Sequence, residues 1–250
     1  MYKRQAVLRR PRNGYVRART ALTRLAFERG LTDTSPQFSL ERFGLDHPER
    51  EIYGASGWFS LHRALPPAEV GPHDVFLDFG SGMGRAVYMA ARRYPFARVM
   101  GVEISPELTE IARRNIEHNR ARLRCTDVEL VVGDAATYEM PDDVTIVYMF
   151  NPFKGSVFQA ALESIVRSLD RAPRPLRIVY QNPVEEQRIL DSGRFRVARR
   201  RRTRSRWPRN TNPWIVTYAS LGPGRPRGAR RAWDGCPGDR ARGRPGQRLA

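Results

Sequence analysis

Residues 75–84 read VFLDFGSGMG, and this stretch decides the fold. The apolar run at its start is typical of a strand buried on both faces, and the sequence RAVYMAA that follows it favours a helix. Gly80, Gly82 and Gly84 therefore stand on the turn between strand and helix. Glycine tolerates a left-handed backbone and lets the main chain come close to a ligand. The pattern predicts a strand-turn-helix unit that binds a nucleotide-like molecule.

Outward from this unit, segments of strand and helix character alternate along the chain. Such alternation predicts an α/β fold in which a parallel sheet is covered by helices on both faces. The last two expected strands have no helix between them, so they could form an antiparallel pair. A helix over 56–65 is expected to lead into the first strand. We expect strands at 74–79, 98–103, 127–132, 143–150, 175–181, 194–199 and 214–220, and helices at 84–93, 106–121, 155–169 and 184–191.

Composition divides the chain into three parts. Residues 1–37 form a basic N-terminal extension with an amphipathic helix expected over 15–30, and residues 38–221 form the α/β domain. Residues 222–250 are rich in Arg, Gly and Pro and cannot bury enough apolar surface to offset their ordering entropy, so we expect disorder there. No apolar run approaches the roughly 20 residues of a membrane span. Because the N-terminus also lacks the apolar middle of a signal peptide, we expect a cytoplasmic protein with no membrane partner.

The formal net charge of +18 lies at the edges of the chain. Residues 1–37 carry nine basic and two acidic side chains, and residues 222–250 carry eight and two. Residues 192–210 hold nine arginines and no acid. Arginine can pair with phosphates in a bidentate way, but 42 of the 44 basic residues are arginine, as the codon bias of a GC-rich genome would also produce. Nucleic-acid binding and codon bias both remain open explanations of the charge.

Acidic residues follow the expected strands. Asp78 stands two residues before Gly80, so the motif is D-x-G-x-G-x-G, and Arg85 takes the place of the third glycine of a dinucleotide fingerprint. An acid at this point would repel a pyrophosphate and suit a ligand that carries an ammonium and a sulfonium. Glu103 ends the second strand, where its carboxylate could accept hydrogen bonds from both hydroxyls of a ribose. Asp134 follows the third strand, where it could accept from an adenine amine.

These residues together resemble the class I S-adenosylmethionine-dependent methyltransferases over about residues 50–220. The resemblance implies a Rossmann-like, seven-stranded, mostly parallel sheet of order 3-2-1-4-5-7-6 with an antiparallel last pair, and S-adenosyl-L-methionine as the cofactor. It makes residues 38–221 the methyltransferase domain. Tyr53 and Ser56 lie where the family often closes over the methionine end of the cofactor. The cofactor-binding residues that it implies are Asp78, Gly80, Ser81, Gly82, Gly84, Glu103, Asp134, Ala135 and Tyr53.

The expected fourth strand points to the methyl acceptor. Its sequence VTIVYMFNPF resembles a group of small bacterial methyltransferases whose fourth strand ends in Asn-Pro-Phe. Amino-group methyltransferases use a related Asn/Asp-Pro-Pro-aromatic motif, so the resemblance makes Asn151 and Phe153 the catalytic residues. The motif here is one proline short, which leaves a nitrogen acceptor as a hypothesis. Residues 180–182, at the end of the next strand, could line the acceptor pocket.

Several alternatives stay open at this level. The acceptor could be a small molecule or a protein side chain, which we favour, or RNA. A different class of function is a nucleic-acid-binding protein on a methyltransferase-like scaffold that uses the Arg-rich edges. Asp78 could merely cap the helix or pair with Arg85, and Asn151 to Phe153 could be an ordinary turn. Cysteines and histidines show no metal-ligand spacing, so no metal site is expected.

Overall fold

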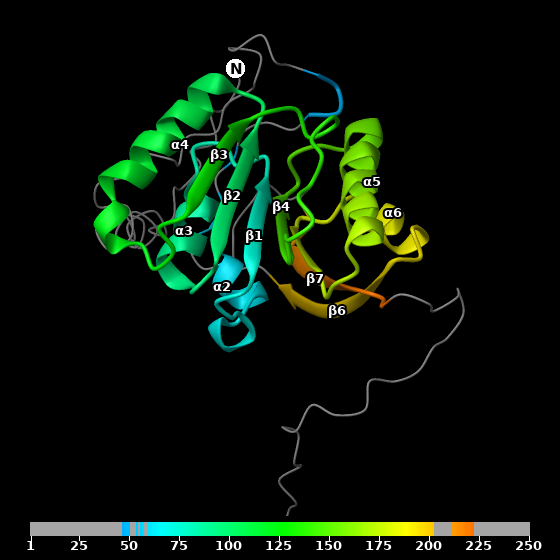
Figure 1. Cartoon of the computed structure of the whole chain (residues 1–250). Coiled ribbons are helices and arrows are strands. Elements are labelled where there is room, and N and C mark those ends of the chain that lie inside the picture. The colour runs from blue at the N-terminus through cyan, green and yellow to red at the C-terminus, as the bar shows by residue number, and fades with distance from the viewer. Residues whose placement is uncertain (1–46, 51–53, 55, 58–59, 203–211, 223–250) are drawn as a thin grey trace, which may run out of the picture.

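The structure is a computed structural model that describes residues 47–50, 54, 56–57, 60–202 and 212–222 (Figure 1). The expected helix over 15–30, residue Tyr53 and nearly all of the expected tail lie outside the described residues. Seven strands form one sheet of order β3-β2-β1-β4-β5-β7-β6. The strands are β1 (Val75–Phe79), β2 (Arg98–Glu103), β3 (Val128–Val132), β4 (Ile146–Phe150), β5 (Arg177–Gln181), β6 (Phe195–Arg202) and β7 (Trp214–Ser220).

The first five strands pair in parallel and the last pairings, of β7 with β5 and with β6, are antiparallel. The predicted Rossmann-like order and the antiparallel last pair are therefore confirmed. The strand expected at 143–150 is shorter than predicted, because residues 142–143 form a turn and β4 begins only at Ile146. The strand expected at 194–199 is longer than predicted, since its arginines continue the ladder with β7 as far as Arg202.

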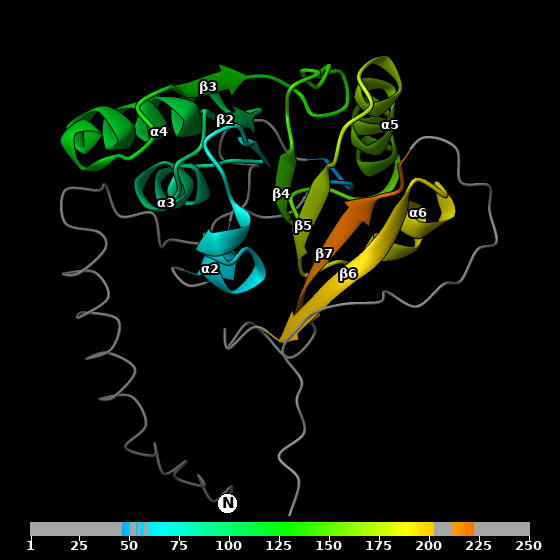
Figure 2. The ribbon, with the colours of Figure 1, turned by 60° about the horizontal axis from the view of Figure 1, so that its bottom comes forward.

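Helices cover both faces of the sheet (Figures 1 and 2). The helices are α2 (Ser60–Ala64), α3 (Arg85–Arg93), α4 (Pro106–His118), α5 (Gly155–Arg171) and α6 (Glu186–Asp191), with short 3-10 turns at Pro67–Glu69 and Arg120–Arg122. The helix expected over 56–65 is shorter than predicted, since Ser56 and Gly57 before it have no regular secondary structure and Pro66-Pro67 follow its end. Its short length leaves Ser56 outside the helix and against the sheet.

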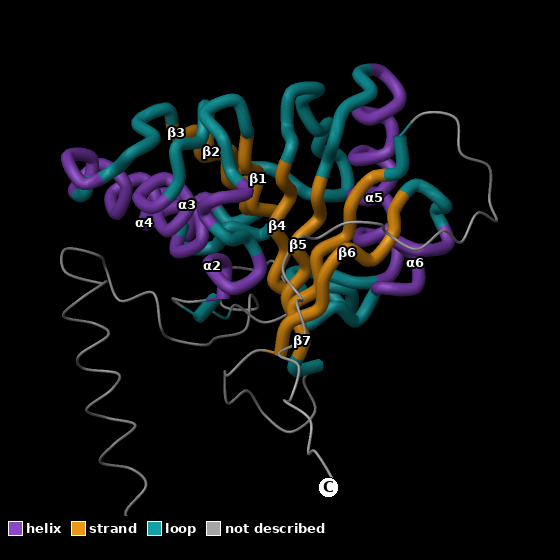
Figure 3. The backbone as a smooth tube through the Cα atoms, turned by 90° about the horizontal axis from the view of Figure 1, so that it is seen from below, coloured by secondary structure: helices purple, strands orange, loops and turns teal. Residues whose placement is uncertain are grey.

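Side chains that alternate along the strands pack into two hydrophobic cores, one on each face of the sheet. Residues Ile146 and Tyr148 of β4 join the core under α2, α3 and α4, whereas Val147 and Met149 join the core under α5 and α6. Since successive side chains of a strand point to opposite faces, β4 is apolar on both faces, as expected of a central parallel strand. Seen from below, the strands run as one twisted layer between the helices (Figure 3). Loops after the carboxyl ends of β1, β2 and β4 then meet at one edge of the sheet.

The described part of the chain contains no helix that combines the length and the apolar character needed to cross a membrane. Over the same residues, no group of three or more histidine, cysteine, aspartate or glutamate side chains has the arrangement of a metal site. Cys125 is buried, and its thiol lies within hydrogen-bond reach of the carbonyls of Ala97 and Asp127. This cysteine therefore serves packing in the α3 and α4 layer.

Candidate cofactor and methyl-acceptor site

The glycine turn has the backbone that the sequence predicted. Gly80, Gly82 and Gly84 adopt φ values of 75°, 54° and 79°, in the left-handed region that other residues rarely enter. A Cβ on Gly80 would lie 2.4 Å from the Cβ of Pro152, and one on Gly84 would lie 2.8 Å from the Cβ of Ala112 in α4. Close packing against protein, besides backbone freedom, therefore requires glycine at two of the three positions.

Asp78 is the acid at the end of β1, and it is buried with 3% of its surface exposed. Among the described residues its carboxylate has no hydrogen-bond donor and no ion-pair partner, so the prediction that it could pair with Arg85 or cap α3 is wrong. Burial, and then the nearby charge of Glu103, raise its pKa well above the ordinary aspartate range. A buried carboxylate without a donor is costly, and a cationic ligand would remove that cost.

Glu103 ends the neighbouring strand β2, and the backbone holds its side chain in place. The amide of Gly82 donates to Oε2 at 2.9 Å and the amide of Ser105 donates to Oε1 at 3.0 Å. Burial raises the pKa of this carboxyl, and these hydrogen bonds oppose the rise. Each carboxylate oxygen has a second lone pair, so the group can still accept hydrogen bonds from two ligand hydroxyls.

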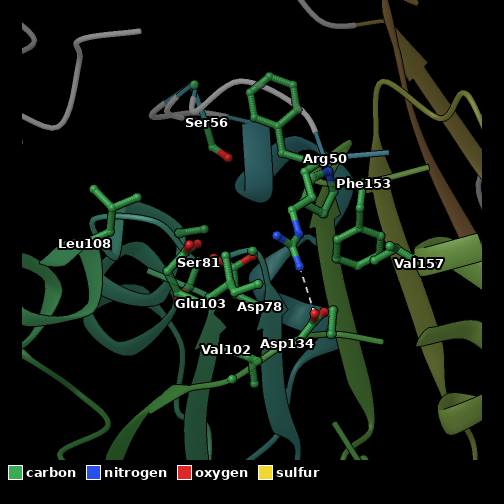
Figure 4. A pocket seen from close by; sticks show the side chains of 18 of the residues that line it. Arg50, Ser56, Asp78, Ser81, Val102, Glu103, Leu108, Asp134, Phe153 and Val157 are labelled. Carbon is green, nitrogen blue, oxygen red and sulfur yellow. Dashed lines mark hydrogen bonds and ion pairs between the residues drawn. The ribbon is translucent and has the colours of Figure 1, made fainter. Parts of the chain in front are cut away.

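Asp134 follows β3 and carries the third acid of the site. Its Oδ1 accepts from the amide of Ala136 at 2.9 Å, and its Oδ2 forms an ion pair with Arg50 at 2.9 Å. Arg50 was missed by sequence reasoning, because nothing near it in the chain points to a partner 84 positions away. It also forms an isolated antiparallel bridge with Phe153. Arg50, which precedes α2 in the chain, thus links the loop after β4 to the acid after β3 (Figure 4).

The three acids line one pocket (Figure 4). Of the residues predicted to bind the cofactor, those that line it are Asp78, Gly80, Ser81, Glu103, Asp134 and Ala135. Gly82 and Gly84 shape the turn beside it. Ser81 Oγ is buried in this lining and has no hydrogen-bond partner among the described residues.

On the acceptor side, Phe153 lines the pocket and Asn151 does not. Asn151 has a left-handed backbone with a φ of 40°, and its Oδ1 accepts a hydrogen bond of 3.3 Å from the hydroxyl of Tyr180. Phe153 is buried and packs edge to face on Phe79, with ring centroids 6.3 Å apart. The structure thus brings Phe153 to the acids and leaves Asn151 beside β5, where residues 180–182 also lie outside the pocket lining.

The start of α5 fixes the loop that carries Phe153. Glu49, another residue that sequence reasoning missed, accepts hydrogen bonds with its carboxylate from the amides of Ser156 and Val157 and from the Ser156 hydroxyl. These donors lower the pKa of Glu49 below the ordinary glutamate range. Its carbonyl also accepts from the amide of Lys154 at 2.8 Å. A carboxylate at a helix N-terminus satisfies amides that have no partner within the helix.

Part of the chain is similar to known proteins. Residues 76–172 match the sequence model of a family described as "Methyltransferase domain". An uncharacterized RNA methyltransferase of Bdellovibrio bacteriovorus is 27% identical over 120 residues, which are 48% of this chain and 28% of that protein. A protein-lysine N-methyltransferase of Saccharolobus islandicus is 32% identical over 90 residues, which are 36% of this chain and 53% of that protein.

Among solved structures, an RNA methyltransferase from Salinibacter ruber in complex with S-adenosyl-L-homocysteine superposes with a TM-score of 0.47. It is 23% identical, and the superposition covers 71% of this chain and 99% of that chain. This chain spans less than a third of the length of the first curated relatives it matches, 28% in both cases.

Residues 76–172 thus match a methyltransferase domain, and the sheet order and the glycine turn are those that the resemblance to class I S-adenosylmethionine-dependent methyltransferases implied. The pocket fits the cofactor of that class. Asp78 offers a carboxylate without a donor to a cationic group, and Ser81 offers a buried hydroxyl without a partner among the described residues. Glu103 is held by backbone amides with lone pairs to spare, as recognition of a ribose requires.

Proposed function

We propose that this protein transfers a methyl group from S-adenosyl-L-methionine to an acceptor bound beside the loop after β4. The observation that carries the proposal is the meeting of Asp78, Glu103 and Asp134 around one pocket. They come from three neighbouring strands of the sheet, at the edge where open α/β sheets bind their ligands. When bound, the cofactor supplies an electrophilic methyl group on a sulfonium sulfur.

Each acid takes a different part of the cofactor in this proposal. Asp78 receives the ammonium, since its carboxylate is buried and has no donor among the described residues. Glu103 accepts from the ribose hydroxyls, and Asp134 accepts from the adenine amine with the lone pairs that Ala136 and Arg50 leave. The glycine turn and Ala135 provide the surface against which the cofactor lies. Tyr53 remains a proposed contact at the methionine end.

The acceptor side is built from the Asn-Pro-Phe segment, with Asn151 and Phe153 as the proposed catalytic residues. Phe153 would pack against the acceptor, since its ring already lines the pocket. Asn151 would have to turn from Tyr180 or use its second lone pair to accept from an acceptor nitrogen. Displacement at the methyl carbon gains chiefly from alignment of the reactants and exclusion of water. The acceptor supplies the electron pair of the new bond and loses a proton if it is an amine.

We favour a small molecule or a protein side chain as the acceptor and keep RNA as an alternative. Relatives named as RNA and as protein-lysine methyltransferases are both similar to this chain. Two arginines of β6 are held by acids of the same domain, Arg199 by Glu69 and Arg200 by Glu186, which favours a structural role for them. The narrower resemblance to the small bacterial group with Asn-Pro-Phe, and a cytoplasmic location, belong to this proposal as well.

Calorimetric titration tests the cofactor assignment. The full chain is titrated with S-adenosylmethionine and separately with NAD, beside the double variant Asp78→Ala, Glu103→Ala. Micromolar binding of S-adenosylmethionine that the double variant loses supports the proposal and justifies a search for acceptors with a labelled methyl donor. If the protein does not bind S-adenosylmethionine and binds RNA tightly with strong salt dependence, the pocket has no cofactor role and the nucleic-acid alternative holds.

A further inference from the structure

A buried chain of hydrogen bonds runs from the pocket into the sheet. Ser56 Oγ and the hydroxyl of Tyr148 lie 2.8 Å apart, and the Tyr148 hydroxyl donates to Oε1 of Gln181 at 3.1 Å. All three side chains are buried, with Tyr148 wholly enclosed in the core beneath α2 and α3. Buried polar groups of this kind are expensive unless they are satisfied, so the chain fixes its members in place.

Which group donates in each of these hydrogen bonds follows from the number of protons available. A hydroxyl has one proton to donate, and that of Tyr148 goes to the Gln181 carbonyl. Ser56 must therefore donate its own proton to Tyr148. With its proton used in this way, Ser56 Oγ has only its two lone pairs left, and these accept hydrogen bonds. Gln181 thus determines, through Tyr148, which kind of hydrogen bond Ser56 can offer to a ligand.

Ser56 is also held from its main chain and faces the pocket. Arg85, at the start of α3, donates from its guanidinium to the carbonyl of Ser56 at 3.2 Å. The side chain of Ser56 lines the pocket together with Asp78 and points into it (Figure 4). Asp78 and Tyr148 are register partners in the parallel pair of β1 and β4, so their side chains leave the same face of the sheet. The pocket is therefore lined by the carboxylate of Asp78 and by the Ser56 hydroxyl, whose partner Tyr148 leaves the same face of the sheet as Asp78.

We propose that the Ser56, Tyr148 and Gln181 chain makes Ser56 an acceptor that, with Asp78, receives the ammonium of the bound ligand. On the proposed function, on which this inference rests, that group is the ammonium of the cofactor's methionine end. Ser56 is the binding residue, and Tyr148 and Gln181 are positioning residues that act through it. The chain would also discriminate against ligands that place an acceptor, such as a carboxylate oxygen, against Ser56.

Two ligands that differ only in the ammonium test the inference. The probes are S-adenosylhomocysteine and its deaminated analogue, which keeps the carboxylate, and the variants are Ser56→Ala, Tyr148→Phe and the two combined. Each single variant should bind S-adenosylhomocysteine roughly 10-fold more weakly, as loss of one hydrogen bond to a charged group implies. The double variant should be no weaker than either single one. Binding of the deaminated analogue should not change.

The matched control is Tyr94→Phe. Tyr94 is another fully buried tyrosine of the same core, and its hydroxyl donates to the carbonyl of Leu65 away from the pocket lining. This variant should bind both probes as the unaltered protein does. If Tyr148→Phe fails to fold, Gln181→Leu provides a second test, since it frees the Tyr148 proton to turn toward Ser56. This variant should bind S-adenosylhomocysteine more weakly and bind the deaminated analogue as before.

The possible failures are distinct. Equal weakening of both probes, additive losses in the double variant, or no change in any variant would overturn the inference and leave the proposed function standing. If the unaltered chain binds neither S-adenosylhomocysteine nor S-adenosylmethionine, the proposed function itself fails.

Discussion

Replacing Asp78 with asparagine should stabilise the ligand-free protein and at the same time weaken its binding of S-adenosylmethionine. The carboxylate is buried, has no donor among the described residues and lies within range of the Glu103 charge. An unsatisfied buried charged group costs on the order of 1–3 kcal/mol or more, and the neutral amide of nearly equal shape removes part of that cost. At about 2–4 °C per kcal/mol for a chain of this size, the midpoint of thermal unfolding should rise by a few degrees at pH 8.

The binding effect has the opposite sign. Loss of a charge-assisted hydrogen bond to an ammonium should cost about 1.5–3 kcal/mol of binding free energy. The dissociation constant should therefore increase roughly 10- to 150-fold. Differential scanning calorimetry of the dialysed protein and isothermal titration measure the two effects. Asp74→Asn at the other end of β1 is the control. Asp74 accepts from the amide of Gly71 and the hydroxyl of Thr145, so its replacement should lower the midpoint and leave binding unchanged.

The raised pKa of Asp78 also sets the pH dependence of this stabilisation. A carboxyl whose pKa is raised on folding contributes stability below its unfolded pKa and loses that contribution as the pH rises through the folded pKa. The gain from asparagine should therefore be largest at alkaline pH and shrink toward acid pH. A variant that unfolds at a lower temperature than the unaltered protein at pH 8, or that binds the cofactor as tightly, would refute the reasoning about Asp78.

Three further predictions follow from the same geometry. Ser81→Ala should leave the unfolding midpoint unchanged, because the hydroxyl has no partner among the described residues. The same variant should bind S-adenosylmethionine roughly 2- to 10-fold more weakly in the same titration. Gly155→Ala should destabilise the protein by about 1–3 kcal/mol in urea unfolding, since its Cβ would lie 2.1 Å from Oε1 of Glu49 at a φ of 60°, whereas Glu49→Gln should cost less. Cofactor binding should tighten as the pH rises through the raised pKa of Asp78, with proton release that titrations in two buffers of different ionisation enthalpy detect; pH-independent binding would contradict an ionised Asp78 in the complex.

Much of the fold could be predicted because its signals are local. The apolar run of β1 and the three glycines after it lie within ten consecutive residues, and they need only their own backbone preferences to form the turn. The boundaries were less predictable. Val144 is buried, yet it lies between a turn and the start of β4. In the sequence, such an apolar residue cannot be distinguished from the first residue of a strand. Burial alone does not reveal whether a backbone pairs in a sheet.

The sequence by itself determined which residues stand at the ends of the strands. Asp78 and Glu103 follow an apolar run directly and Asp134 follows one after Gly133, and parallel strands place their carboxyl ends at one edge. Their meeting could therefore be predicted without coordinates. The same holds for Phe153, which follows β4 by three residues and lines the pocket.

Only the tertiary structure decided what supports these residues. Arg50 meets Asp134 across 84 positions, Ser56 meets Tyr148 across 92, and Glu49 meets Ser156 across 107. Partners so far apart leave no mark in local pattern or spacing. They depend on where the segment before β1 crosses the sheet, and packing of the whole domain determines that position. The acids could therefore be predicted from the sequence, and their supporting contacts could not.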